Sequence, residues 1–176
     1  MCFRATSLLC LMLLLLGRNG PSQEFRPAEY QVKAAFLFNF TKFVEWPRRA
    51  FASQTSPLVI GILGENPFHD DLGRMIQNKT VDGHPLEIRL LNSAQQATNC
   101  HILFISAPQS QQLQETLKAL RGNPILTVGE TERFTEVGGM INFFLEGTKI
   151  RFQINNEAAT RAGLKISSKL MSLASR

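Results

Sequence analysis

The 176-residue sequence is poor in cysteine, and two of its three cysteines, Cys2 and Cys10, lie within the first ten residues. Outside that segment Cys100 stands alone, so a domain formed by the rest of the chain has no internal disulfide. Cysteine pairs spaced for a zinc site or a dithiol redox motif are also missing. The chain must therefore fold through its apolar core, and a chain of this size buries about 68–70% of its unfolded surface without other help.

Long hydrophobic runs are also missing, since the longest, Leu8 to Leu16, has only nine residues. As a helix it would rise about 13 Å, too short for the ~30 Å hydrocarbon core of a membrane. Arg4 precedes the run, and the small residues Gly20 and Ser22 suit the −3 and −1 positions of a cleavage site, which is typical of a secretory signal peptide. We expect residues 1–22 to be this signal and residues 23–176 to form one exported domain; an uncleaved interfacial anchor is the alternative.

Charge is modest as well, with 19% charged residues against 44% apolar residues. That balance excludes a disordered or collagen-like chain. The net charge of +5 falls to +3 when Arg4 and Arg18 leave with the signal. Because no dense Lys/Arg tract accompanies this weak charge, we expect no nucleic-acid partner.

Apolar segments and turn residues alternate along the remaining chain. Strands alternate with helices through the middle, and a hairpin and a helix follow, which favours an α/β fold. We expect a layered, mostly parallel central sheet with helices on both faces and a C-terminal antiparallel hairpin plus helix. The expected helices are 28–46, 66–76, one or two turns in 93–98, 106–120, 131–137 and 156–174; the expected strands are 58–63, 80–81, 86–91, 101–105, 125–128, 140–146 and 149–155.

Motifs for catalysis or cofactor binding are missing. The sequence has no G-x-S-x-G, H-E-x-x-H or C-x-x-C, and residues 61–67 lack a dinucleotide fingerprint and a P-loop lysine. His69, Asp70 and Asp71 are adjacent, so on a helix they diverge and cannot face one ion. We therefore expect no catalytic residue, cofactor or metal, and we interpret Cys100 as a buried, inert thiol.

The first predicted helix has more apolar surface than one core needs. On a helical wheel Phe38 falls among polar side chains and Trp46 lies on the flank, so both are candidate partner-binding residues. The alternative is that they are singly exposed aromatics, which are common. The predicted core arc is Val32, Phe36, Leu37, Phe40, Phe43 and Val44, and the predicted polar side is Gln31, Thr41, Lys42 and Glu45.

The last predicted helix shows a similar excess. Leu164 and Met171 share a face that is not the predicted core stripe, and a basic ridge of Arg161, Lys165 and Lys169 runs beside it. This arrangement predicts a docking surface for an acidic or amphipathic partner, whereas a solvated face with apolar lysine stems is the alternative. The predicted core stripe is Ala159, Ala162, Ile166, Leu170 and Leu173.

Several blocks of the sequence together resemble the YfiR-like family of bacterial exported proteins. The resemblance covers residues 28–174, and its first and last blocks are the most specific. The blocks are YQVKAAFLFNFTKFVEWP (30–47), CHILFIS (100–106), ILTVG (125–129), GMINF (139–143) with KIRFQIN (149–155), and LKISSKL (164–170).

The resemblance implies a periplasmic regulator without catalysis. Such a protein represses a membrane-bound signalling enzyme, a diguanylate cyclase or a histidine kinase, by binding its periplasmic part, and an outer-membrane lipoprotein relieves the repression. The expected consequences are control of cyclic di-GMP and biofilm formation, and the expected form is a homodimer. The paired cysteines of the best-understood member are missing here, because Cys100 is alone. A periplasmic small-ligand-binding sensor is the alternative function, and an exported enzyme is a third.

Overall fold

The computed structural model describes residues 22–106 and 112–175. The predicted signal peptide, residues 1–22, lies outside this range except for Ser22, and so does part of the predicted helix 106–120. Within the described part of the chain, no helix has both the length and the apolar character needed to cross a membrane. Nor do three metal-ligating side chains gather anywhere among these residues.

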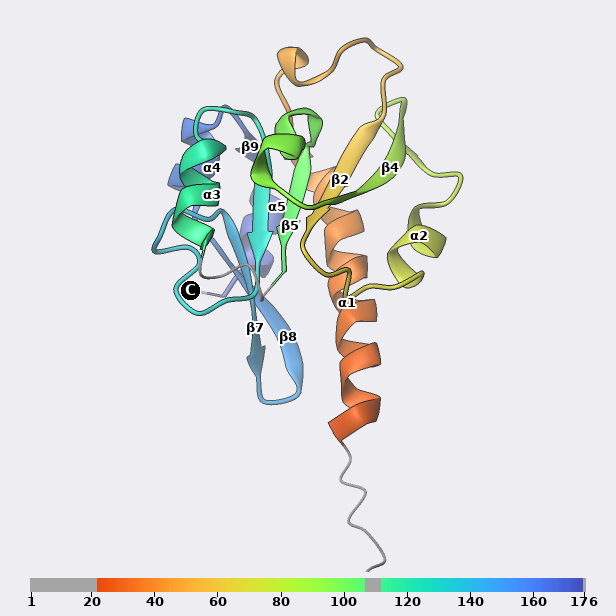
Figure 1. Ribbon diagram of the computed structural model, residues 1–176, viewed down its shortest axis with the longest axis vertical. Helices are drawn as coiled ribbons and strands as arrows, with labels where there is room; N and C mark the ends of the chain where they lie inside the picture. The colour runs from red at the N-terminus through yellow and green to blue at the C-terminus, as the bar shows by residue number, and fades with distance from the viewer. Residues whose placement is uncertain (1–21, 107–111, 176) are drawn as a thin grey trace, which may run out of the picture.

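Seven strands form the central sheet (Figure 1). They are β2 (Leu58–Leu63), β3 (Thr80–Val81), β4 (His84–Leu91), β5 (Ile102–Ile105), β6 (Leu126–Gly129), β7 (Ile141–Glu146) and β8 (Lys149–Ile154). Their order is β3-β4-β2-β5-β6-β7-β8. The five strands from β4 to β7 are parallel, while β3 and β8 pair antiparallel at the two edges. The predicted fold class, including the antiparallel hairpin after the parallel strands, is confirmed.

Both faces of the sheet are buried. Ile60 and Phe104 belong to the larger core, whereas Val59 and Leu103 belong to a second core on the opposite face. Successive side chains of a strand point to opposite faces, so a strand buried on both sides is apolar throughout. This explains why β2 reads as an uninterrupted apolar run, and why its bounds were predicted correctly from the sequence.

The long helix α1 (Ser22–Phe43) packs against the larger core and ends where the short strand β1 (Val44–Glu45) begins. Leu37, Phe40 and Val44 are buried as predicted. Val32, predicted to face the core, is 44% exposed, and Thr41, predicted to be polar surface, is buried with its hydroxyl donating to the Phe38 carbonyl at 2.6 Å. The core face of α1 is therefore rotated from the predicted one. Phe36 and Phe43 lie half-buried at its border.

Shorter helices complete the two layers. The helix α2 (Asp71–Ile76) packs beside α1, and α3 (Leu113–Ala119) covers the other face of the sheet. Two 3-10 helices, η1 (Arg48–Ala50) and η2 (Ala94–Asn99), lie in connections. The predicted helix at 66–76 begins later than expected, because His69 adopts a φ of +46°, outside the right-handed helical region.

The connection between β6 and β7 contains turns and not the predicted helix at 131–137. Arg133 has a φ of +63°, which a continuous right-handed helix does not allow. The adjacent Phe134 is fully buried, and its ring occupies the space beside Gly129 and Gly139, where a Cβ atom would lie only 2.1–2.3 Å from the ring. The segment is therefore folded inward around one aromatic side chain.

The C-terminal segment is not one helix over 156–174, and that prediction is wrong. It consists of α4 (Asn156–Arg161), a short strand β9 (Lys165–Ile166) and α5 (Ser168–Leu173). Gly163, with a φ of +81°, follows the end of α4, as glycine does in helix C-terminal motifs. The Ser167 hydroxyl then accepts from the Leu170 N–H at 3.2 Å and caps α5. The cap of α4 is Asn155 and not the expected Asn156.

Candidate partner-binding surface

The segment that follows α1 and the C-terminal segment meet at one side of the molecule. The strand β1 pairs antiparallel with β9, so that Val44 lies opposite Ile166 and Glu45 opposite Lys165. The Ser167 N–H donates to the Phe43 carbonyl at 2.9 Å and extends this contact to the start of α5. The blocks 30–47 and 164–170, which are far apart in sequence, therefore form a single structural unit.

Three lysines, Lys42, Lys165 and Lys169, lie in or beside this unit. We use the term basic α1–α5 surface for these lysines together with the Phe38 and Phe43 rings, which Lys42 and Lys169 contact. The Lys42 ammonium lies 3.9 Å from the centroid of the Phe38 ring, and the Lys169 ammonium lies 5.3 Å from that of Phe43. Such contacts at exposed sites contribute about 0.5–1 kcal/mol each. They hold cationic groups over aromatic side chains at the surface, an arrangement suited to an acidic or amphipathic partner.

Charge neutralisation on this surface is incomplete. The Lys165 ammonium lies 3.8 Å from the Glu45 carboxylate, and both side chains are largely exposed, so their attraction is weak. Among the described residues, no carboxylate lies within 4.0 Å of the Lys42 or Lys169 ammonium. The surface therefore retains positive charge that a partner could neutralise.

The structure brings together some of the predicted site residues. Lys165 and Lys169 are exposed beside α1, Met171 is 37% exposed on α5, and Phe38 is half-buried on α1. Leu164, in contrast, is only 2% exposed and belongs to the larger core. It was placed on a surface because the wheel assumed one continuous helix, and the break at Gly163 turns it inward. Leu164 is therefore a core residue.

Trp46 and Arg161 occupy other positions. The Trp46 indole N–H donates to the His101 carbonyl at 3.0 Å, which ties the segment after β1 to the start of β5. Arg161 is on α4, where it pairs with Glu157 and lines a pocket that also contains Arg121. The predicted ridge of three basic residues is therefore divided, and Lys165 and Lys169 remain on the basic α1–α5 surface.

A buried cluster of charges was missed by the sequence analysis. The Lys33 ammonium, in a residue only 4% exposed, contacts the Glu29 carboxylate and lies 2.5 Å from the Glu130 carboxylate. The Tyr30 hydroxyl donates to Glu130 at 2.9 Å. Glu130 directly follows β6, so the cluster joins α1 to the carboxyl edge of the sheet. The spacing of Glu29 and Lys33 by four residues was the available sequence signal.

The groups with the most perturbed chemistry belong to the core. Burial raises the pKa of the Cys100 thiol to about 11 and lowers that of His101 to about 4. The Val59 N–H donates to Nδ1 of His101 at 3.1 Å, so this nitrogen already has a partner. A protonated thiol and an enclosed imidazole are poorly suited to nucleophilic or general-base roles. The expected burial of Cys100 is confirmed.

Comparison with protein families identifies the family to which the chain belongs. The YfiR/HmsC-like family model matches residues 30–175, which is most of the chain, and the chain belongs to this family. The match begins at Tyr30 in α1 and continues beyond α5, so it includes both halves of the unit formed by β1 and β9. The resemblance predicted from the sequence is confirmed. The family is one of periplasmic regulatory proteins and not of enzymes.

Proposed function

We propose that this protein is a periplasmic repressor that binds the periplasmic part of an inner-membrane signalling enzyme, of the diguanylate cyclase type, and thereby lowers cyclic di-GMP and biofilm formation. Membership of the YfiR/HmsC-like family supports the regulatory role. The observation that carries the proposal is the pairing of β1 with β9, which joins the two most specific sequence blocks at the surface.

The basic α1–α5 surface supplies the binding chemistry of this proposal. Lys42 and Lys169 raise the rate of encounter with an acidic segment of the partner, because opposite charges steer association. Phe38 and Met171 provide apolar area for the contact itself, since aromatic and methionine side chains are enriched in interfaces. Backbone hydrogen bonds of the β1–β9 pair and of Ser167 with Phe43 tie the two segments together, which limits the conformational entropy lost on binding.

The remaining parts of the proposal concern location and assembly. Residues 1–22 act as the signal peptide, and the protein functions as a homodimer. An outer-membrane lipoprotein competes for the repressor and relieves repression. Mass measurement of the native periplasmic protein tests the first point, because cleavage near Ser22 predicts a defined loss of mass. Sedimentation of the purified protein tests the second.

Crosslinking in intact cell envelopes tests the binding surface. The variant Lys42→Glu/Lys169→Glu reverses two charges that have no carboxylate partner among the described residues. We expect it to reduce capture of the cyclase about tenfold or more and to raise cellular cyclic di-GMP. The matched control is Lys79→Glu/Lys118→Glu, at two exposed lysines outside this surface, one before β3 and one in α3. An equal loss of capture in the control would contradict the proposal.

A further inference from the structure

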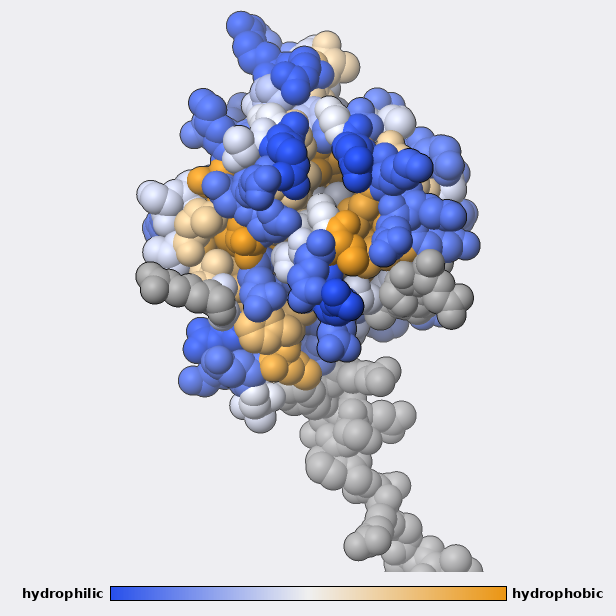
Figure 2. Space-filling view, turned by 90° about the vertical axis from the view of Figure 1, so that its left-hand side faces the viewer, coloured by the Kyte–Doolittle hydropathy of each residue, from blue (hydrophilic) through white to orange (hydrophobic). Residues whose placement is uncertain are grey.

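A second site lies on the side of the molecule that carries α3 and α4. Figure 2 shows this side, where apolar patches lie between hydrophilic side chains. A pocket of about 630 Å³ opens between the two helices above β6, within the size range of small-molecule sites. Each helix and the turn after it line the pocket at spacing i, i+3 and i+4. The residues are Leu117 of α3 with Leu120 and Arg121 just beyond its end, and Ala158 and Arg161 of α4 with Ala162 just beyond its end.

The pocket is open because the surrounding positions have little side-chain volume. The β6–β7 connection forms no helix above the sheet and instead buries Phe134 inward. Gly122 and Gly138 both line the pocket, and a Cβ atom built on either one would meet nothing within 4 Å. Ala158 of α4 and Ala162, the residue that follows α4, add to this effect. The space is therefore built into the fold and does not depend on the position of one long side chain.

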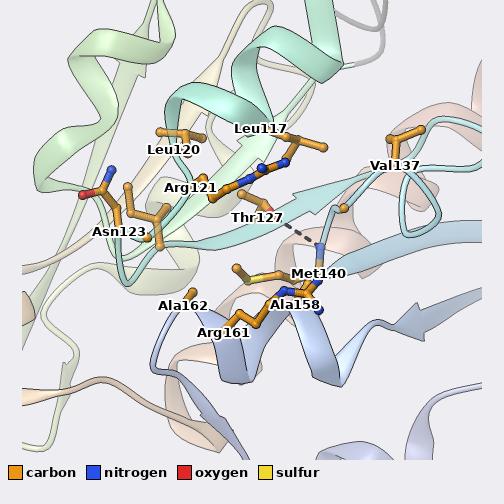
Figure 3. A pocket seen from close by; sticks show the side chains of 13 residues that line it. Leu117, Leu120, Arg121, Asn123, Thr127, Val137, Met140, Ala158, Arg161 and Ala162 are labelled. Atoms are coloured by element: carbon orange, nitrogen blue, oxygen red, sulfur yellow. Dashed lines mark hydrogen bonds between the residues drawn. The ribbon is translucent and has the colours of Figure 1, made fainter.

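The floor of the pocket is apolar, because Ile125 and Met140 are buried there. The one hydroxyl beside them, that of Thr127, already accepts from the Met140 N–H at 3.1 Å (Figure 3). In the part of the chain that the structure describes, no buried side-chain nitrogen or oxygen of this floor lacks a hydrogen-bond partner. A ligand body that lies on this floor must accordingly be apolar.

The charge of the pocket has one sign. Its lining contains Arg121 and Arg161 and no carboxylate. Figure 3 shows the two arginines on opposite walls, with Met140 between them. Arg161 also pairs with the exposed Glu157 on its own helix, whereas no carboxylate of the described residues lies within 4.0 Å of Arg121. Guanidinium groups are the preferred partners of carboxylates, because their N–H groups match the two oxygens.

We propose that this pocket binds a small amphipathic carboxylate, with its apolar body on Leu120, Ile125 and Met140 and its carboxylate between Arg121 and Arg161. The proposal goes beyond the repressor function and uses none of the basic α1–α5 surface. It gives the protein a second input, in which a soluble metabolite of this class stabilises the folded domain. The ligand would contact α4, which is followed along the chain by β9 of the basic α1–α5 surface region.

Calorimetric titration of the purified protein with octanoate tests the proposal, with octan-1-ol and octyl phosphate as probes of the head group. We expect saturable binding of octanoate and at least tenfold weaker binding of the alcohol. Arg121→Gln and Arg161→Gln should each weaken octanoate binding by about tenfold to a hundredfold, the effect of losing a charged hydrogen bond. Leu117→Trp, which fills the pocket without changing charge, should abolish binding.

The control variant is Arg133→Gln, which removes an exposed arginine outside the pocket and should leave octanoate binding unchanged. Unchanged affinity in both pocket arginine variants would overturn the proposal, as would equal binding of octan-1-ol or no binding of octanoate. Tighter binding of octyl phosphate than of octanoate would overturn the assignment to carboxylates. Because the titration contains no partner protein, its failure is distinct from failure of the repressor function.

Discussion

The ring of Phe51 stacks on the imidazole of His101, with centroids 4.3 Å apart and planes inclined by 29°. The opposite face of Phe51 stacks on His84 at 3.9 Å, so the phenyl ring lies between two imidazoles. This stack excludes water from His101, which is only 4% exposed. Removal from water disfavours the charged imidazolium.

The enclosed His101 predicts a loss of stability in mild acid. Burial lowers its pKa to about 4, below the ordinary value of about 6.5. Between these values only the unfolded chain binds the proton, so the free energy of unfolding falls as the pH falls from 6.5 to 4. We expect His101 to account for about 2–3 kcal/mol of this fall. Urea unfolding at pH 7 and pH 4.5 measures it.

His101→Gln is the test variant for this pH dependence, and His69→Gln, at an exposed position, is its control. The first should reduce the difference in unfolding free energy between the two pH values, and the second should preserve it. An identical pH dependence in the wild type and His101→Gln would show that the imidazole does not carry the effect.

The space around Phe134 predicts an unusual sensitivity to one methyl group. In Gly139→Ala the new Cβ would lie 2.1 Å from the phenyl ring, so the ring or the backbone must move. We expect a loss of about 1–3 kcal/mol in unfolding free energy, typical of overpacking. Gly73→Ala is the matched control, because its Cβ meets nothing within 4 Å and alanine favours the helix. Thermal unfolding should show opposite shifts for the two variants.

The burial of Lys33 beside two carboxylates predicts that the stability of the fold depends on its positive charge. In Lys33→Met the carboxylates of Glu29 and Glu130 remain largely buried without their cation. Removing one partner of a buried ion pair costs about 3–5 kcal/mol. We expect such a loss in urea unfolding, and partial recovery in Lys33→Met/Glu130→Gln. A double variant less stable than the single one would contradict this account.

The division of the C-terminal segment predicts different roles for two of its apolar residues. Leu164→Ala should lower the unfolding free energy by about 2–5 kcal/mol, because Leu164 is packed in the core. Met171→Ala should change it by less than about 0.5 kcal/mol, since Met171 is exposed, yet should weaken partner capture. Melting temperatures and envelope crosslinking distinguish these effects. Equal melting temperatures for the two variants would contradict the arrangement of β9 and α5.

The parallel strands could be predicted from the sequence because their signal is local. The run 58–63 is apolar throughout, and the turn at Asp82 and Gly83 separates β3 from β4 as expected. The signals at Gly163 and Ser167 were also local, but the apolar spacing of 159, 162, 166 and 170 concealed the break. Periodicity alone does not distinguish one helix from two short helices joined by a strand.

The candidate surface could be predicted only in part, because it depends on pairing between distant segments. No local pattern indicates that Glu45 lies opposite Lys165. The contact between Lys33 and Glu130 likewise spans 97 positions, and it buries a lysine on the core side of α1. A helical wheel weighs side chains by polarity, so it places a lysine outside unless its distant partner is known.

The pairing of β1 with β9 also makes completion of the fold around α1 depend on the last part of the chain. Ribosomes produce α1 long before residues 164–173, which cover the end of its apolar side. Until those residues arrive, the nascent chain exposes phenylalanine-rich surface that chaperones recognise and that promotes aggregation. Contacts between residues so far apart in sequence also form slowly. The chain must lose the entropy of closing a long loop before the contact contributes any favourable energy. The larger core is therefore complete only after the last part of the chain has been synthesised.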